Sequence, residues 1–213
     1  DKLLVAGSGN PNILLLANQT GKVEWQHALE KGEECNAVAL TQKGEILYSY
    51  KRGAKLVTWD HKVVWDYKTP DKTELQSATL LRNGGVLLGI CGVPAQFIEL
   101  DKKGKEVNKV TLNLEVERPH SQFRQVFQLR NSNYLIPVMA KQKVLEVSRK
   151  GKIIAEHQIE GKAFSSLELP DGNLLLPCGD NHCYIVIDRK TGEEMKRVNA
   201  LDIEGVASVS YTH

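Results

Sequence analysis

Two arginines and a histidine near the middle of the chain are the residues best suited to recognise or transform a ligand. Arg118 and His120 lie in the loop 115–122, and Arg124 follows it closely. A guanidinium group binds carboxylates and phosphates through two parallel hydrogen bonds, and an imidazole can act as a general base. Long loops in a repeat array often mark the working face. The alternative is a solvated loop stiffened by Pro119.

Four neutral polar residues recur at one position of the strands that we expect to be innermost. These strands align on four leucines, Leu40, Leu81, Leu129 and Leu169. The residue four places earlier is polar in each strand: Asn36, Ser77, Gln125 and Ser165. Together these residues could form a ring of hydrogen-bonding groups around a ligand or ordered water. The alternative is that inner strands line a wet channel, where polar residues are needed in any case.

The loop 178–183 holds two cysteines, a histidine and an aspartate within six residues. Zinc accepts all of these residue types, but a structural zinc site normally has a second pair of ligands, which is missing here. We therefore expect Cys178 and Cys183 to be ordinary strand ends, with a disulfide between them as the alternative. Cys91 occupies the matching position of an earlier repeat, where a small apolar residue closing a strand explains it.

No recognised motif of catalysis or cofactor binding is present. The chain has no serine nucleophile elbow, no phosphate-binding glycine loop and no His-Glu-x-x-His helix. His27, His61 and His157 fall on predicted outer hairpins, where we expect surface residues. The lack of such motifs therefore argues against an enzyme, and we expect no cofactor and no metal.

A repeated hairpin must position these candidates. Its clearest copy is TGKVEW at Thr20–Trp25, which follows an apolar run. Similar turns follow at His61, Gly104, Gly151 and Gly192, and the spacings from Gly21 onward are 40, 43, 47 and 41 residues. A period in the low forties built of short strands predicts a β-propeller. A hairpin of this kind cannot bury its apolar face alone, so the copies must stack.

Each repeat is predicted to form a blade of four antiparallel strands. In the second repeat these strands are Cys35–Gln42, Glu45–Tyr50, Lys55–Asp60 and Lys62–Lys68. The innermost strands of the next three repeats are predicted at Leu75–Arg82, Gln122–Arg130 and Phe164–Leu169. We therefore expect an all-β fold, a single β-propeller domain over residues 1–213 with about five blades visible.

The two ends of the chain leave the number of blades open. The chain opens with only three predicted strands, the first at Leu3–Gly7, and closes with a lone strand at Val206–Tyr211. Pairing those two strands would complete a ring of five blades and remove exposed edges. The last residues carry no turn signal, and we expect a truncated C-terminus and a ring of six or seven blades.

The Thr-Gly-Lys-x-x-Trp element at residues 20–25, with its partial copy at 62–65, resembles pyrroloquinoline-quinone-type propeller repeats. The overall run is similar to small exported propellers of Bacteroides-type bacteria labelled surface-layer proteins. The resemblance implies Trp25 and Trp65 packed between blades, and export to the periplasm or cell surface. The tryptophan position holds Asn108, Ala155 and Lys196 in the later repeats. Quinone enzymes of that family hold their cofactor near adjacent cysteines and calcium, and this chain has no Cys-Cys pair.

Composition narrows the classes of partner. The 213 residues are 41% hydrophobic and 25% charged, as is usual for a globular protein. A net charge of +2 is too small to favour nucleic acid. No apolar run approaches the ~20 residues of a membrane helix, so we expect no transmembrane segment.

These observations favour a non-catalytic binding or scaffold propeller that presents a loop face to a protein or small-molecule partner. The alternative is a propeller enzyme, a lyase or hydrolase, that uses His120 with Arg118 or Arg124 at the mouth of the channel. The sequence does not identify the ligand.

Overall fold

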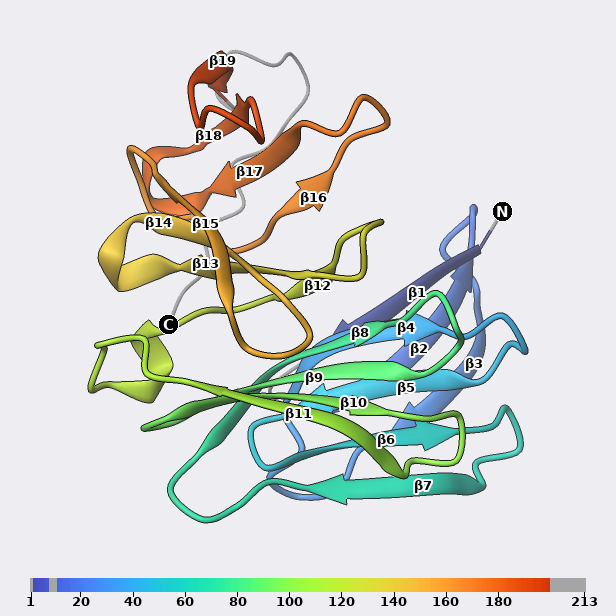
Figure 1. Cartoon of the computed structure of the whole chain (residues 1–213). Coiled ribbons are helices and arrows are strands. Elements are labelled where there is room, and N and C mark those ends of the chain that lie inside the picture. The colour runs from blue at the N-terminus through green and yellow to red at the C-terminus, as the bar shows by residue number, and fades with distance from the viewer. Residues whose placement is uncertain (1, 8–10, 200–213) are drawn as a thin grey trace. The chain divides into compact units, whose positions relative to one another are not determined.

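The computed structural model describes residues 2–7 and 11–199, and within them the chain is built almost entirely of antiparallel strands (Figure 1). The first three strands are β1 (Lys2–Gly7), β2 (Ile13–Asn18) and β3 (Val23–Ala28). The second group is β4 (Cys35–Leu40), β5 (Ile46–Tyr50), β6 (Gly53–Val57) and β7 (Val63–Lys68). The third group is β8 (Glu74–Leu80), β9 (Val86–Cys91), β10 (Ala95–Leu100) and β11 (Glu106–Leu112).

The remaining strands form two further groups. The fourth group is β12 (Phe127–Gln128), β13 (Tyr134–Val138), β14 (Lys143–Val147) and β15 (Ile153–Gln158). The fifth group is β16 (Leu167–Glu168), β17 (Leu174–Cys178), β18 (Cys183–Ile187) and β19 (Glu194–Asn199). Three single 3-10 turns interrupt the connections: η1 (Pro119–Ser121), η2 (Met139–Lys141) and η3 (Gly179–Asn181).

Each group is one sheet whose strands pair in chain order, so the described residues form the five blades of a β-propeller. The first blade has three described strands and the others have four. The predicted all-β fold of four-stranded antiparallel blades is therefore confirmed. The prediction of a ring of six or seven blades is wrong, because the described residues form five. The predicted strand Val206–Tyr211, whose pairing with Leu3–Gly7 was the argument for five blades, lies outside the described residues.

The chain divides into two compact units, Asp1–His120 with blades 1 to 3 and Ser121–His213 with blades 4 and 5. Apolar residues of blades 2 and 3, including Leu56, Trp65 and Leu88, share one core in the first unit. Residues of blades 4 and 5, including Leu135 and Leu176, share a core in the second. Each core is formed between neighbouring blades, because one blade cannot bury its own apolar face.

The turn between the third and fourth strands of each blade repeats with little change. Asn18, Thr58, Asp101 and Ser148 each accept a backbone hydrogen bond from the residue three places later, and Asp188 accepts one from the residue four places later. That donor residue has a positive φ in every blade: it is Gly21, His61, Gly104, Gly151 and Gly192. A positive φ costs glycine little, which explains the periodic glycines that predicted the fold.

Trp65 shows how one blade contacts the next. Its ring is buried, and the Cβ of any side chain added to Gly104 would lie 2.7 Å from its Cγ. The indole of β7 therefore lies directly on the β10–β11 turn of the following blade. Trp25 is only half-buried, and its Nε1 donates to the carbonyl of Trp59 in the β6–β7 turn, at 2.8 Å. The expected packing between blades is thus complete for Trp65 and partial for Trp25.

His157 corrects one expectation. It was predicted at the surface, but its side chain is buried in the second unit. The tryptophan position of this blade holds Ala155, which pairs with Glu146 as Trp65 pairs with Leu56. The imidazole two residues further on contacts the next turn instead, because a Cβ at Gly192 would lie 2.6 Å from its Nδ1. His157 thus makes the contact with the following turn that Trp65 makes in the second blade.

Substitutions at two equivalent turn glycines distinguish the free-energy cost of backbone strain from that of overpacking a neighbouring side chain. Gly21 has a φ of 81° and nothing within 4 Å of an added Cβ, whereas Gly104 has a φ of 80° and contacts Trp65. Gly21→Ala should therefore cost about 1 kcal/mol, from backbone strain alone. Gly104→Ala should cost a further ~1–3 kcal/mol, because the methyl group overpacks the indole. Urea denaturation of both variants measures this difference, and equal losses would contradict the packing.

Candidate functional site

Glu74, at the start of β8, gathers side chains from three segments of the first unit. Its carboxylate accepts an ion pair from Lys51 Nζ at 2.9 Å, a contact from His120 Nδ1 at 3.2 Å, and a hydrogen bond from Gln76 Nε2 at 3.2 Å. Burial alone would raise the pKa of Glu74, but the bonds from Lys51 and His120 outweigh it and lower that pKa. The carboxylate is therefore charged at neutral pH and holds its partners in place.

The partners of Glu74 come from loops at one end of the strand. Lys51 lies in the β5–β6 turn and His120 in η1, and their side chains are 63% and 61% exposed although they are fixed at one end. Arg52 fastens the loop before β8, because it donates to Thr73 O at 2.8 Å and pairs with Asp71 at 3.0 Å. Lys51 and His120 are therefore two exposed side chains, each able to donate a hydrogen bond, that contact the same carboxylate.

Three of the predicted site residues, His120, Arg118 and Ser77, lie at this end of the first unit. Arg118 is exposed, two residues before His120, and Ser77 is fully buried within β8. The association of His120 with a carboxylate was not predicted, because Glu74 is 46 residues away and carries no motif. Its only sequence signal is its place three residues before Ser77, the polar position of the inner strand.

The register of the inner strands revises the alignment of the predicted row. The amide of Thr41 donates to Glu45 O as the amide of Leu81 donates to Gly85 O, so Thr41 rather than Leu40 is the counterpart of Leu81. Asn36 is therefore one residue out of register with Ser77. It lies at a β-bulge in β4, is exposed, and donates from its side chain to Leu75 O at 2.9 Å. Asn36 thus connects β4 to β8.

The other predicted residues belong to the second unit. Arg124, Gln125 and Ser165 are all half-buried. The amide of Gln125 donates to the carbonyl of Phe164 at 3.1 Å, which places it beside the segment of Ser165. These residues precede strands that are far shorter than predicted, since β12 and β16 each have two residues. The arrangement of all four polar residues around one channel stays a prediction.

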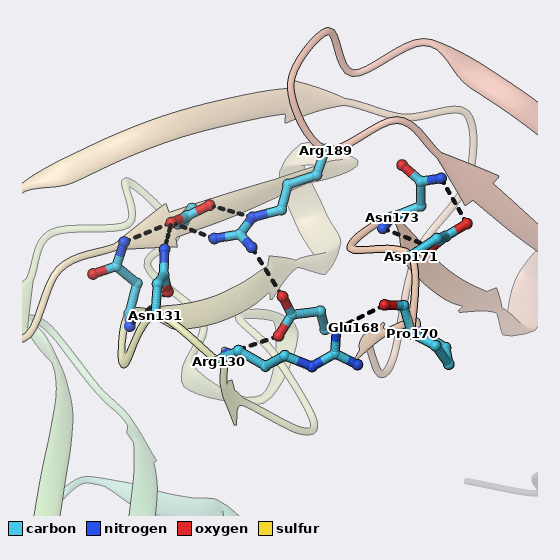
Figure 2. A network of polar contacts seen from close by, with 9 residues as sticks. Arg130, Asn131, Glu168, Pro170, Asp171, Asn173 and Arg189 are labelled. Atoms are coloured by element: carbon cyan, nitrogen blue, oxygen red, sulfur yellow. Dashed lines mark hydrogen bonds and ion pairs between the residues drawn. The ribbon is translucent and has the colours of Figure 1, made fainter.

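A buried charge network in the second unit was not predicted (Figure 2). Arg189, in the β18–β19 turn, donates to both oxygens of Glu146 at 2.8 and 2.9 Å and to Glu168 at 3.0 Å. Asn131 and Asn133 also donate to Glu146, at 2.9 and 2.5 Å. Figure 2 shows Arg189 and Asn131 approaching from different turns, with Glu168 bonded to the guanidinium.

The network occupies the place that an indole fills in the first unit. Glu146 pairs with Ala155 in the position where Leu56 pairs with Trp65. A groove of about 700 Å³ lies beside it and is lined by Ala155, Arg189, Asp188 and Lys190 among others. The sequence carries a signal of this network. Alanine replaces the tryptophan at Ala155, and the residue paired with it is Glu146, where the second blade has Leu56. Every polar atom of this carboxylate is bonded, so we interpret the network as structural.

A second buried network lies between the first two blades. The Nζ of Lys55 pairs with Glu33 at 2.6 Å and Glu30 at 3.2 Å, and the hydroxyl of Tyr48 donates to Glu33 at 3.1 Å. Burial alone would lower the pKa of Lys55, but the bonds to Glu33 and Glu30 outweigh it and raise that pKa. Lys55, Glu33 and Glu30 each have an oppositely charged partner, so this network also stabilises the fold.

The cysteines behave as expected. All four are free, and Cys178 lies opposite Cys183 across β17 and β18 without a bond between them. Burial raises the pKa of the Cys178 thiol to about 12, which makes it unreactive. In the part of the chain that the structure describes, no group of three histidine, cysteine or acidic side chains could hold a metal ion. No helix in those residues is long and apolar enough to cross a membrane.

Comparison with known proteins identifies the family. The model of the Mal s 1 allergenic protein-like family matches residues 10–212, so the chain belongs to that family. A protein of unknown function from Bacteroides caccae, known from a crystal structure, is 40% identical. That match covers 96% of this chain and 75% of the other, with a TM-score of 0.89. No curated protein matches the sequence.

More distant structures share only the fold. A streptogramin B lyase is 12% identical with a TM-score of 0.74, over 93% of this chain and 65% of the other. A catalytically inactive virginiamycin B lyase from Staphylococcus aureus, with a histidine replaced by alanine and with quinupristin, is 13% identical. Its TM-score is 0.69, over 93% of this chain and 73% of the other. The WD40 propeller domain of Doa1 has a TM-score of 0.72 at 11% identity, over 93% and 64%.

The buried network makes the stability of the protein sensitive to acid. Burial alone would raise the pKa of Glu146, but the bonds from Arg189, Asn131 and Asn133 hold it at about 2, below its ordinary value of 4.5. The charged carboxylate therefore stabilises the fold above pH 4.5, and this stabilisation is lost as the pH falls through about 2. It amounts to about 3 kcal/mol.

Glu146→Gln should lower the free energy of unfolding at pH 7, and its deficit relative to the wild type should shrink between pH 4.5 and 2. Urea denaturation across that range measures both effects. Glu156→Gln is the matched control, because Glu156 is exposed and forms a surface ion pair with Lys143 in the same blade, at 3.0 Å. The control should change the free energy by less than ~1 kcal/mol. A deficit of Glu146→Gln that does not depend on pH would contradict the charged network.

Proposed function

We propose that the protein is a binding propeller that recognises an anionic group, on a protein or small molecule, at the Glu74 end of β8. The observation that carries the proposal is that one carboxylate fixes Lys51 and His120 side by side while both remain more than half exposed. Exposed lysines normally lose conformational entropy on binding a ligand. Here much of that cost is met in the free protein.

The charge of this end favours an anion. Glu74 is already bonded by three donors, whereas Lys51, Arg118 and His120 retain exposed donor groups. A carboxylate or phosphate suits such a set, because charge-assisted hydrogen bonds are the strong ones. Asn36 and Ser77 are further candidate contacts within the first unit. Arg124, Gln125 and Ser165 are candidate contacts of the second unit taken by itself.

The location and partner class are part of the same proposal. Export to the periplasm or cell surface rests on the resemblance to small exported propellers, and a surface-layer role rests on the same basis. The small net charge of +2 supports a protein or small-molecule partner in preference to nucleic acid.

A propeller lyase or hydrolase is the second candidate function, and one observation favours it. The contact of His120 Nδ1 with Glu74 at 3.2 Å is how a carboxylate orients an imidazole and leaves its other nitrogen for proton transfer. Two of the fold neighbours are described as lyases. At 12–13% identity those neighbours support the fold alone, so the binding function comes first.

Isothermal titration calorimetry of the full chain against dicarboxylates, phosphate monoesters and acidic sugars tests the proposal. Lys51→Ala and His120→Ala should each weaken binding of the anion that the wild type selects. Each loses a charge-assisted hydrogen bond of about 1.5–3 kcal/mol, roughly tenfold or more in Kd. Lys103→Ala is the matched control, because Lys103 is exposed in the β10–β11 turn and its loss changes the net charge equally.

Equal effects of Lys51→Ala and Lys103→Ala would reduce the site to general electrostatics and contradict the proposal. His120→Gln separates the two functions, because an amide can still donate a hydrogen bond but cannot act as a base. Retained binding with no turnover to lose supports the binding function, whereas retained binding with loss of a measured turnover supports the enzyme.

A further inference from the structure

A cavity of about 230 Å³ lies between blades 2 and 3 of the first unit, at the opposite end of β8 from Glu74. Leu56 and Trp65 of blade 2 form part of its wall, and Gly84 and Lys102 come from two turns of blade 3. The volume equals that of roughly eight water molecules in the liquid. It therefore suits a ligand with a single ring, smaller than those that fill pockets of ~300–1,000 Å³.

Trp59 occupies the equivalent position between blades 1 and 2. It holds the same place in its turn as Lys102, since each directly follows the residue whose carbonyl closes the turn. Its ring lies edge-on to Trp25, with centroids 4.8 Å apart and planes at 82°. It also lies beside Gly44, because a Cβ added there would be 3.5 Å from the Nε1 of Trp59. An aromatic ring therefore fits between the indole of one blade and a turn glycine of the next.

The same two neighbours line the cavity between blades 2 and 3, where lysine replaces the aromatic residue. Trp65 is the counterpart of Trp25, because both pair with a leucine of the adjoining strand. Gly84 is the counterpart of Gly44, because the amide of each donates to the carbonyl three residues earlier. The Cε of Lys102 lies 2.6 Å from a Cβ added to Gly84. A lysine chain is slimmer than an indole, so space for a ring remains beside it.

The indole in the wall of the cavity carries a buried donor. In the preceding interface, the Nε1 of Trp25 donates to the carbonyl of Trp59 at 2.8 Å. The Nε1 of Trp65 is buried, its residue is only 8% exposed, and no group among the described residues accepts a hydrogen bond from it. An unpaired buried donor is costly, and an oxygen of a ligand in the cavity would supply an acceptor.

The charges around the cavity favour an anion. Lys43 and Lys102 are exposed, and neither forms an ion pair or a hydrogen bond in the part of the chain that the structure describes. The two carboxylates that also line the cavity are engaged in their own turns. Asp101 accepts from two backbone amides at 2.8 and 2.9 Å, and Glu45 accepts from the hydroxyl of Thr41 at 3.3 Å. The ammonium groups are therefore available to bind a carboxylate.

Lys102 also differs from its counterparts in two other interfaces between blades. Trp59 packs on the indole of the preceding blade, and Arg189 of the second unit pairs with Glu146 of the preceding blade. At both of those interfaces the side chain at this turn position is bound by the protein itself. At the cavity, the equivalent side chain is left to bind a ligand.

We propose that the cavity between blades 2 and 3 binds a small aromatic carboxylate, with its ring against Trp65 and its carboxylate paired with Lys102 and Lys43. The ring takes the place that the indole of Trp59 has in the preceding interface. The site is separate from the Glu74 site and does not depend on the function proposed there. Phosphate is not a ligand of this cavity, because it has no apolar part to place against Leu56 and Trp65.

Titration of the full chain with benzoate, followed by ¹H–¹⁵N nuclear magnetic resonance, tests the site. The chain has three tryptophans, and Trp25→Phe and Trp59→Phe assign two of the indole signals, which leaves the third for Trp65. Benzoate should shift the indole signal of Trp65 saturably and leave the other two in place. Benzamide has the same shape without the charge, and benzylamine has the opposite charge. Each should bind at least about tenfold more weakly than benzoate.

Substitutions of Lys102 distinguish the cavity from general electrostatics. Lys102→Trp introduces the residue that the preceding interface uses, so the protein should fold with the cavity filled and benzoate binding lost. Lys102→Gln keeps most of the chain length, removes the charge and should weaken binding about tenfold. Lys103→Gln is the matched control, because Lys103 is exposed in the same turn and does not line the cavity. It should leave binding unchanged.

Three results would overturn the proposal: benzoate binding that persists in Lys102→Trp, benzylamine binding as tight as that of benzoate, or no saturable shift of the Trp65 signal at millimolar benzoate. Circular dichroism shows whether Lys102→Trp folds. If it does not, the comparison of Lys102→Gln with Lys103→Gln decides. A loss confined to Lys102→Gln supports the site, and equal losses refute it.

Discussion

Within each unit, the contact of an outer strand with the next blade's turn is the constraint on which the packing depends. Trp65 rests on Gly104, His157 rests on Gly192, and Trp25 lies against Trp59 and His61. A single blade has an apolar face that it cannot bury, so the fold exists only where this contact is made. The turn must approach closely, and glycine at positive φ permits that approach.

Changes at this contact create the unusual chemistry of the chain. Where alanine replaces the tryptophan, at Ala155, the facing residue is Glu146 and an ion network with Arg189 fills the space. Where histidine replaces the turn glycine, at His61, a second histidine and an indole gather around it. A charge buried without its partner would be costly, so Glu146 requires the guanidinium of Arg189 beside it. Each exception therefore brings together several residues that differ from their repeat equivalents.

The sequence predicted the fold because its signal is periodic and local. Turn residues and alternating strands are short-range features, and their spacing alone indicated a propeller. It did not predict the register of Asn36, because the inner strands were aligned on leucines, and the counterpart of Leu81 in the second blade is the polar residue Thr41, one place after Leu40. It also placed His157 at the surface, since that ring is covered by the turn of the next blade at Gly192, 35 residues further along the chain. Contacts between residues of different blades cannot be predicted from the type of either residue alone.

The candidate sites likewise combine features that the sequence predicted with features that it did not. Arg118 and His120 were found from the sequence because they share one long loop, but the residue that fixes His120 is Glu74, from another blade. The repeat determines where each strand begins, whereas the loops between strands differ from blade to blade. His61 departs from its repeat equivalents, because four glycines show that the turn folds without a side chain at this position. Its imidazole stacks on Trp25 of the preceding blade, so it adds a contact between blades although a residue other than glycine is disfavoured at positive φ.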